Sequence, residues 1–195
     1  MNEFSLICRI LGSLYNRAPT DPVIQPLLSL ISEGKLQQQW PLEQDELLAV
    51  LQKSCDLPAL EEDYRALFTG EHPAVSLSGS DWEDGPEEQE VRTFLQQRGM
   101  PLSETPANQF GVLLLATSWL EDQSQQDEFM AQVTLFEEYL LPWCGAFLGK
   151  VEANARTPFY RSLAGLTRGA IQAMYEELSE QVNHRQDESG NAEQP

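Results

Sequence analysis

Carboxylates are the side chains best suited to chemistry in this sequence, and they are densest in the segment DWEDGPEEQE at residues 81–90. Such a group could bind a metal ion or attract a basic partner. Its spacing does not match the DxDxDG pattern of a calcium loop, and the chain has no ExxH pair of the kind that holds a di-iron centre. We interpret the segment either as a solvated loop and helix start or as a docking surface for a basic peptide segment, with Trp82, Glu83 and Asp84 as candidate binding residues.

Other catalytic and metal-binding patterns are missing from the sequence. The histidines are His72 and His184, too few for HExxH and for most imidazole-rich metal sites. The cysteines Cys8, Cys55 and Cys144 form no CxxC pair, so we expect buried free thiols and neither disulfides nor a thiolate metal site. The motifs GxGxxG, GxxxxGKS/T and GxSxG do not occur. We therefore expect no metal, no cofactor and no catalytic residue, and a protein that is not an enzyme.

The chain carries a formal net charge of −19 at pH 7. Such an acidic protein does not suit nucleic acid or anionic membranes, because both require clustered Lys and Arg. It would attract basic partners, although solubility alone would also explain the charge. No apolar run approaches the roughly 18 residues of a membrane span, and Glu3 and Arg9 interrupt the stretch where a secretory signal would be apolar. We expect a cytoplasmic protein without nucleic-acid binding or membrane insertion.

The segment EYLLPW places a proline, Pro142, inside a helical pattern of apolar residues. A proline in a helix removes a hydrogen bond and crowds the preceding turn, at a cost of about 3 kcal/mol or more. It suits the first turn of a new helix, so we predict a junction at Leu141. Trp143 would then pack into the core, while Glu138 and Tyr139 would end the first helix with outward-facing polar groups. An ordinary core tryptophan beside a helix break would use the same residues.

The elements around these residues all have helical periodicity, so we predict an all-α, single-domain helical bundle over residues 1–182. A disordered polar tail is expected over 183–195, because it has almost no apolar side chain to bury. Thr105-Pro106 and Thr157-Pro158 indicate the starts of the central and final helices. The other expected elements are helices within 4–14, 23–35, 42–55, 60–70 and 87–99, an apolar central helix body at 110–120, and a long loop at 72–86.

Three motifs resemble the TorD/DmsD/NarJ family of redox-enzyme maturation chaperones and look closest to its YcdY-type branch. DYRALFTG at 63–70 is similar to the family's YxxLFxG motif, and EYLLPW is similar to its DHLxPW motif. TPFYRSLAGLTRGAI at 157–171 resembles its final helix, and the resemblance extends from the first helix to about Leu178. It implies a TorD-like helical bundle whose LxPW segment lies near the surface that binds the client protein.

Three stretches depart from the family pattern, and one of them is AVSLSGSDW at 74–82, which stands where the family has a proline-rich, aromatic, Glu-Ser stretch. The Asp-His pair before LxPW is Glu138-Tyr139 here, and the pair often found before the central helix is Asn108-Gln109. Members of the TorD and DmsD kind bind twin-arginine leader peptides and insert or protect a molybdenum cofactor in the client, so these departures bear on leader binding. The candidate client-binding residues are Glu138, Tyr139, Pro142, Trp143, Trp82, Glu83 and Asp84.

The favoured function is a cytoplasmic assembly chaperone that binds an apo-metalloenzyme, such as a molybdoenzyme-type oxidoreductase or its leader, and assists cofactor insertion. The alternative is a chaperone for a leaderless cytosolic metal-dependent hydrolase such as a zinc phosphatase. A noncatalytic helical scaffold or regulator is the alternative from another class. The expected partner is the apo form of a client metalloenzyme, and the sequence is compatible with both a monomer and a dimer.

Overall fold

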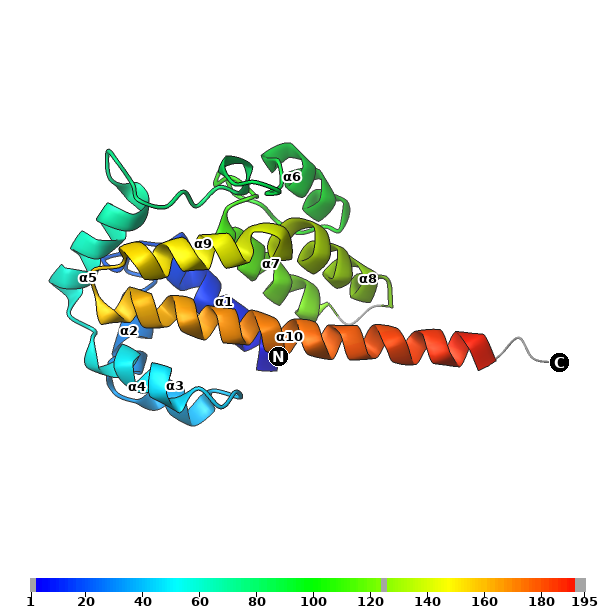
Figure 1. Ribbon diagram of the computed structural model, residues 1–195, viewed down its shortest axis with the longest axis horizontal. Coiled ribbons are helices and arrows are strands. Elements are labelled where there is room, and N and C mark those ends of the chain that lie inside the picture. The colour runs from blue at the N-terminus through cyan, green and yellow to red at the C-terminus, as the bar shows by residue number, and fades with distance from the viewer. Residues whose placement is uncertain (1–2, 124–125, 192–195) are drawn as a thin grey trace.

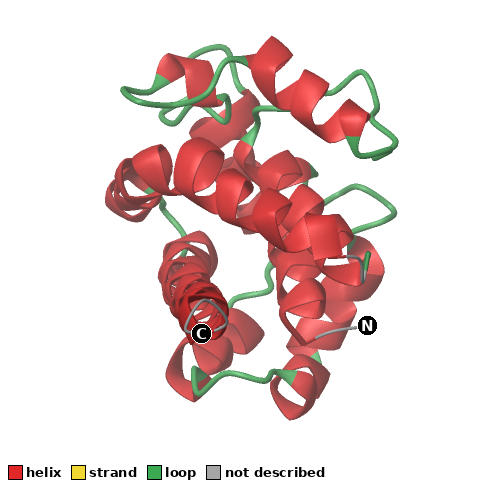
Figure 2. Cartoon of the chain, turned by 90° about the vertical axis from the view of Figure 1, so that its right-hand side faces the viewer, coloured by secondary structure: helices red, strands yellow, loops and turns green. Residues whose placement is uncertain are grey.

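The structure is a computed structural model that describes residues 3–123 and 126–191, and helices are its main secondary structure (Figure 1). Within those residues strand-like pairing is limited to one isolated antiparallel bridge between Ser78 and Gln109, and Figure 2 shows only helices and loops. The elements are α1 (Glu3–Asn16), α2 (Gln25–Ser32), α3 (Lys35–Gln39), α4 (Asp45–Lys53), α5 (Leu57–Tyr64), η1 (Arg65–Thr69), η2 (Gly79–Asp81), α6 (Glu88–Gln97), α7 (Phe110–Asp122), α8 (Gln126–Thr134), η3 (Leu135–Leu140), α9 (Leu141–Asn154) and α10 (Pro158–Asn191). Segments η1 and η3 are π-helical, and η2 is a 3₁₀ turn. The predicted all-α, single-domain class is confirmed.

Helices α1 and α7 pack closely in the centre of the bundle (Figure 1). A Cβ atom at Gly12 would lie 2.9 Å from the carbonyl oxygen of Gly111, and one at Gly111 would lie 2.8 Å from the carbonyl oxygen of Gly12. The two backbones approach so closely that neither position has room for a side chain. Helix α7 is buried along most of its length, as its continuous apolar body predicts.

Backbone hydrogen bonds hold the long loop at 72–86 in place. The Val75 N–H donates to the Leu67 carbonyl over 2.8 Å, and the Gly79 N–H donates to the Asn108 carbonyl over 2.9 Å. The first bond ties the loop to η1, and the second ties it to the segment before α7. These bonds attach the loop to the rest of the fold at two places.

The central helix begins later than the sequence predicts. The Phe110 N–H donates to the Leu77 carbonyl over 2.9 Å, and the Gln109 N–H closes a turn on the Pro106 carbonyl over 3.2 Å. Through these bonds the segment after Thr105 forms a turn and pairs with the loop at 72–86. The predicted start at Thr105-Pro106 is therefore wrong, and α7 starts at Phe110.

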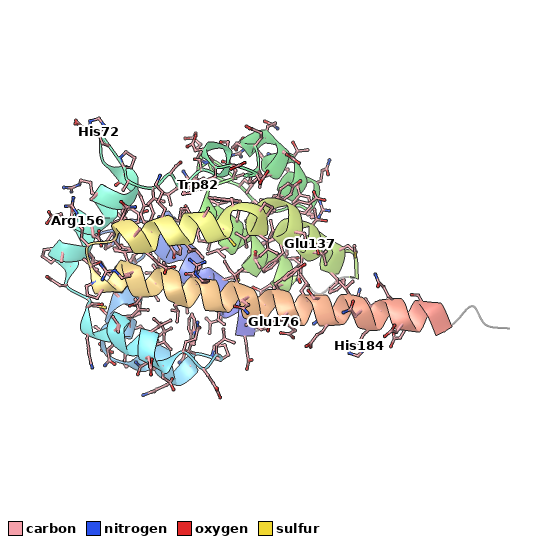
Figure 3. The ribbon with its side chains drawn as sticks, viewed as in Figure 1. His72, Trp82, Glu137, Arg156, Glu176 and His184 are labelled. Atoms are coloured by element: carbon pink, nitrogen blue, oxygen red, sulfur yellow. The ribbon has the colours of Figure 1, made fainter. Side chains whose placement is uncertain are left out.

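A buried carboxylate, that of Asp63, organises the start of α10; Arg156, which precedes this helix, is labelled in Figure 3. Asp63 of α5 is 1% exposed and accepts the Thr157 N–H at 2.8 Å, the Thr157 hydroxyl at 2.6 Å and the Arg156 N–H at 3.1 Å. The Thr157 hydroxyl oxygen in turn accepts the Tyr160 N–H over 3.3 Å. An anion at a helix N-terminus satisfies free N–H groups and is favoured by the helix dipole. The predicted helix start at Thr157-Pro158 is confirmed.

Helix α10 also packs against the start of α4 through a glycine. A Cβ atom at Gly169 would lie 2.6 Å from Nε2 of Gln44. This amide nitrogen donates to the Leu166 carbonyl over 3.1 Å, and Oε1 of Gln44 accepts the Trp40 indole N–H over 2.9 Å. The GxxxG spacing of Gly165 and Gly169 therefore serves close packing within the bundle.

The last helix extends into the segment that the sequence predicts to be a disordered tail. Helix α10 continues to Asn191 and extends beyond the rest of the bundle (Figure 1), so the segment 183–191 is helical, while 192–195 lie outside the described residues. The Arg185 guanidinium lies 4.0 Å from the centroid of the Phe129 ring, which attaches the extension to α8. Among the described residues no helix combines the length and the apolar character needed to cross a bilayer.

The π-helical segment η3 leads directly into α9 at the predicted proline junction. The Leu141 N–H donates to the Phe136 carbonyl, five residues back, which is the hydrogen-bond spacing of a π-helix. Helix α9 then begins at Leu141, with Pro142 in its first turn, where its missing N–H costs no hydrogen bond. The Trp143 indole N–H donates to the Tyr139 carbonyl over 2.7 Å. A side chain thus satisfies a carbonyl at the break.

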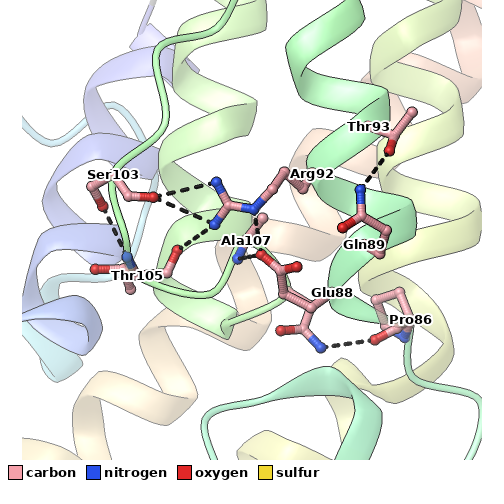
Figure 4. Close-up of polar contacts among 9 residues, drawn as sticks. Pro86, Glu88, Gln89, Arg92, Thr93, Ser103, Thr105 and Ala107 are labelled. Carbon is pink, nitrogen blue, oxygen red and sulfur yellow. Dashed lines mark hydrogen bonds and ion pairs between the residues drawn. The ribbon is translucent and has the colours of Figure 1, made fainter.

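A polar network fixes α6 against the segment that precedes α7 (Figure 4). Oε1 of Glu88 accepts the Arg92 Nε–H at 2.6 Å and the Ala107 N–H at 3.2 Å. The same guanidinium donates to the Ser103 carbonyl and, over 3.2 Å, to the Thr105 carbonyl. The hydrogen bond from Arg92 is the main reason why the pKa of Glu88 is lowered, and the bond from Ala107 adds to it. The acidic segment is thus partly structural.

The contribution of the buried Asp63 carboxylate to the free energy of unfolding can be tested by mutation. Asp63→Ala leaves the N–H groups of Arg156 and Thr157 without their acceptor, so it should lower the free energy of unfolding by about 3 kcal/mol. Glu62→Ala removes an exposed carboxylate of the same helix and should change it by less than about 0.5 kcal/mol. Urea unfolding followed by circular dichroism measures both. Equal, small effects in the two variants would show that the start of α10 does not depend on Asp63.

The Glu88 network should make stability depend on pH. Because the folded-state pKa of Glu88 is lowered, its contribution is fully present above the ordinary carboxyl pKa and is lost as the pH falls through the folded-state value. Glu88→Gln should therefore lower the melting temperature near pH 7 by roughly 2–4 °C. The difference from wild type should disappear at acid pH, as measured by thermal melts. A difference that stays constant with pH would contradict the role of the charge, and Glu104→Gln is the exposed control.

Candidate functional site

Two of the predicted site residues meet where the long loop crosses α9. The centroid of the Trp82 ring lies 6.2 Å from that of Trp143 and 5.9 Å from that of Phe147, and we call these three residues the tryptophan cluster. Trp143 is 1% exposed, whereas Trp82 is partly exposed and lies above α9 in Figure 3. One indole therefore belongs to the core, and the other covers it at the surface.

The loop fixes the position of Trp82. The Trp82 indole N–H donates to the Ser76 carbonyl over 3.0 Å, and the Ser76 hydroxyl donates to Oδ2 of Asp81 over 2.5 Å. A Cβ atom at Gly85 would lie 1.8 Å from the carbonyl oxygen of Gly79, so this turn closes only with glycine. The partly exposed face of the indole is thus held in one orientation, which lowers the entropic cost of using it as a binding surface.

Tyr139 lies in the core, which corrects the prediction that its polar group faces outward. The side chain is 6% exposed, and its ring meets the Phe94 ring edge to face with centroids 5.2 Å apart. The hydroxyl donates to Oε1 of Glu90 over 3.5 Å. Burial raises the pKa of Tyr139, and the charges of Glu90 and Glu138 raise it further. The π-helical turn directs position 139 inward, so this tyrosine connects η3 to α6.

The other predicted contacts are at the surface. Glu138 and Pro142 are exposed at the junction of η3 and α9, and Glu83 and Asp84 are exposed in the turn after Trp82. Asp84 has a φ of 62°, in the left-handed region that Asp tolerates better than most residues. Within the described ranges, none of these three carboxylates takes part in an ion pair. Their charges are therefore not neutralised by a neighbouring side chain.

Lys150 is a candidate site residue that the sequence analysis missed. Its Nζ lies 5.5 Å from the centroid of the Trp82 ring, in the range of a cation–π contact. The signal was present, because Lys150 follows Trp143 and Phe147 at helical spacing in α9. What the spacing did not show is that the loop brings Trp82 to this face of the helix.

Asn108 is the second missed residue. Its side chain is buried, and Nδ2 donates to the Pro86 carbonyl over 3.0 Å and to the Ser80 hydroxyl over 3.2 Å. These bonds connect the segment before α7 to both ends of the turn that carries Trp82. The departure from the family pattern at Asn108-Gln109 was the available signal, and the structure shows that Asn108 positions the loop.

The chemistry that this arrangement offers is that of a binding surface. Among residues 3–123 and 126–191, no three His, Cys, Asp or Glu side chains come together in a way that could hold a metal ion. The cysteines are free, and burial raises the pKa of Cys8 and raises that of Cys55 to about 11, so both thiols are protonated near neutral pH. The partly exposed Trp82 indole, which has Lys150 over it, can bind apolar groups. The unpaired carboxylates that follow it in the sequence can bind basic groups.

Comparison with known proteins places these features in a family. Residues 33–149 match the family model described as nitrate reductase delta subunit. The chain is 63% identical to the chaperone protein YcdY of Escherichia coli K12, over 92% of this chain and 98% of that protein. It is 40% identical to an uncharacterized protein of Haemophilus influenzae, over 93% and 97% of the two chains. It is 28% identical to the Tat proofreading chaperone DmsD of Salmonella typhimurium, over 86% of each chain. The chain therefore belongs to the nitrate reductase delta subunit family, which includes TorD, NarJ and DmsD.

Proposed function

We propose that this chain is a noncatalytic chaperone of the cytoplasm that binds a client metalloenzyme in its apo form and assists insertion of the cofactor. Membership of the family and similarity to two proteins named as chaperones support this function. The observation that carries it is the fixed, partly exposed indole of Trp82 on a buried aromatic support. Such a surface can hold an incompletely folded segment without any reaction.

The surface has two kinds of contact to offer to a client. Trp82 supplies a rigid aromatic face, and aromatic residues held in a fixed position often carry much of the binding energy of an interface. Glu138, Glu83 and Asp84 supply negative charge that no other described side chain neutralises. Charges of this kind mainly raise the association rate and select basic partners. The client segment is therefore expected to combine an apolar anchor with basic residues.

A client without a twin-arginine leader is the second candidate, and one observation favours it. The family's two Asp-His pairs correspond to Asn108-Gln109 and Glu138-Tyr139. Asn108 is buried, and its side-chain amide donates to the Pro86 carbonyl of the loop. Tyr139 is buried against Phe94. Neither side chain offers an exposed group to a leader peptide. This burial supports a leaderless metal-dependent hydrolase, such as a zinc phosphatase, as the alternative client to a molybdoenzyme-type oxidoreductase.

Client capture tests the proposal directly. The tagged chain is purified from cells, and the co-eluting protein is identified and its metal content measured. We expect a metalloenzyme with less metal than its mature form, and we expect Trp82→Ala to reduce its recovery roughly tenfold, which is about 1.4 kcal/mol of binding. A twin-arginine leader on the captured precursor would favour the oxidoreductase, and its absence would favour the hydrolase.

Trp119→Ala is the matched control for that variant. Trp119 is another partly buried tryptophan, located on α7, and the loss of either indole should cost about 1–2 kcal/mol of stability. Only the loss of Trp82 should reduce client recovery when the two variants melt at similar temperatures. Equal recovery in both variants would place the client surface elsewhere, and capture of no metalloenzyme would leave a scaffold or regulator as the better interpretation.

The acidic turn, which we define as residues 83–87, should control the rate at which the client associates with the chain. Converting Glu83, Asp84 and Glu87 to their amides should slow association with the captured client roughly threefold at low salt and make the rate less dependent on ionic strength. Asn tolerates the left-handed backbone at position 84, so stability should hardly change. Glu88 is left intact because it holds Arg92 and Ala107. Surface plasmon resonance over a range of salt concentrations measures the effect.

The control removes the same charge from another exposed region. Amide substitutions of Glu43, Asp45 and Glu46, at the start of α4, change the net charge equally. If these changes slow association as much as those in the acidic turn, the effect comes from the total charge. Unchanged rates in both triple variants would show that the acidic turn does not steer the client.

A further inference from the structure

The ammonium group of Lys150 lies over the Trp82 ring and has no carboxylate partner in the part of the chain that the structure describes. Its Nζ is 5.5 Å from the centroid of that ring, and Lys150 is exposed. None of the ion pairs between described residues includes this lysine. Glu152, the next acid in α9, pairs with Arg168 over 2.6 Å. Among the described side chains, the ring is therefore what attracts this cation.

Two other aromatic rings among the described residues carry a cation, and both are covered more closely. The Arg98 guanidinium lies 3.8 Å from the centroid of the Phe94 ring, and Nη1 of the same guanidinium donates to the Phe94 carbonyl over 3.0 Å. The Arg185 guanidinium lies 4.0 Å from the centroid of the Phe129 ring. Both phenylalanines are 8% exposed. In both cases a close arginine accompanies a buried ring.

The cover on Trp82 is looser. The Nζ distance of 5.5 Å is near the outer limit of about 6 Å for a cation–π contact, and Trp82 stays partly exposed. The hydrogen bond that Lys150 forms with Asn154 uses the main-chain carbonyl, so it does not restrain the ammonium group. A lysine ammonium is strongly hydrated and sits on a flexible stem, whereas the Trp82 indole is fixed by its bond to the Ser76 carbonyl. The lysine, and not the ring, is therefore the group that can move.

We propose that Lys150 is a displaceable cover on the Trp82 ring, which occupies the ring in the free chain and is displaced when an uncharged aromatic or aliphatic side chain of the client binds there. This inference rests on the proposed function, because it takes the ring as the anchor site of the client. A cover of this kind lowers the affinity of every apolar group for the ring by the same factor. Only a segment that makes further contacts with the surface then binds, so the lysine discourages nonspecific apolar association.

The first test measures how accessible the ring is when no client is present. Trp119→Phe removes the other partly buried tryptophan, while Trp40 and Trp143 are 8% and 1% exposed. Fluorescence quenching by the uncharged probe acrylamide then reports mainly on Trp82. In this background Lys150→Gln should raise the quenching constant roughly twofold. Lys150→Arg should lower it, because a guanidinium covers a ring more closely.

Lys53→Gln is the matched control in the same background. Lys53 is another exposed lysine that forms no ion pair with a described residue, and its loss changes the net charge equally. The quenching constant should stay as it is in the parent chain. If Lys150→Gln and Lys53→Gln give equal constants, the lysine does not cover the ring and the proposal is wrong.

The second test measures binding of an uncharged aromatic probe, N-acetylphenylalaninamide, to the full ¹⁵N-labelled chain. Binding is followed at the indole N–H resonance of Trp82. Lys150→Gln should bind the probe roughly two- to fivefold more tightly than wild type, and Lys150→Arg should bind it more weakly. Weaker binding by Lys150→Gln would identify the lysine as a contact residue and would overturn the proposal. An unshifted Trp82 resonance in Lys150→Gln would overturn it too, because the uncovered ring would then bind no apolar group.

The cover and the client surface can fail separately. If Lys150→Gln exposes the ring and binds the probe more tightly while Trp82→Ala retains the client, the cover stands and the client surface lies elsewhere. If the accessibility of the ring does not change in Lys150→Gln while Trp82→Ala loses the client, the client surface stands and the cover is wrong.

Discussion

Pro142 has no amide hydrogen to donate, and it lies in the first turn of α9, at the junction with η3 that supports the candidate site. The preceding turn widens to a π-helix, in which the Leu141 N–H reaches the Phe136 carbonyl. The Tyr139 carbonyl is satisfied by the Trp143 indole at 2.7 Å. This bond fixes the tryptophan in the core, where it supports the indole of Trp82 from below. The residue that follows the proline therefore ties the helix junction to the core and supports the candidate site.

The site separates structural from surface groups within short stretches of sequence. Glu138 is exposed and Tyr139 is buried, although they are neighbours in the chain. In the acidic segment, Glu88 holds Arg92 and the Ala107 amide, whereas Glu83 and Asp84 are exposed and form no ion pair with a described residue. Proximity in sequence is therefore a poor guide to role here. The hydrogen-bond partners of each group distinguish those that hold the fold from those that are available to a partner.

Helix periodicity and the proline rule predicted most of the fold, because both depend on neighbours within one or two turns. The junction at Leu141 and the Thr157 hydroxyl cap on the Tyr160 N–H are of this kind. The start of α7 and the inward position of Tyr139 depend on the partners Leu77 and Phe94, which are distant in sequence, so local rules missed them. The family resemblance directed attention to the segments that meet at the tryptophan cluster. It did not reveal that Lys150 and Asn108 organise the same surface.

The π-helical turn has a geometric consequence for α9 as a whole. Each residue of an α-helix advances the side chains by about 100° around the axis, so one additional residue within a turn changes the phase of everything that follows. The six-residue length of η3 therefore sets the rotation of α9 relative to α8. With this phase Phe147 and Val151 are directed into the core, and Lys150 reaches the surface beside Trp82. The length of this one turn therefore determines which side chains of α9 face the core and which face the candidate site.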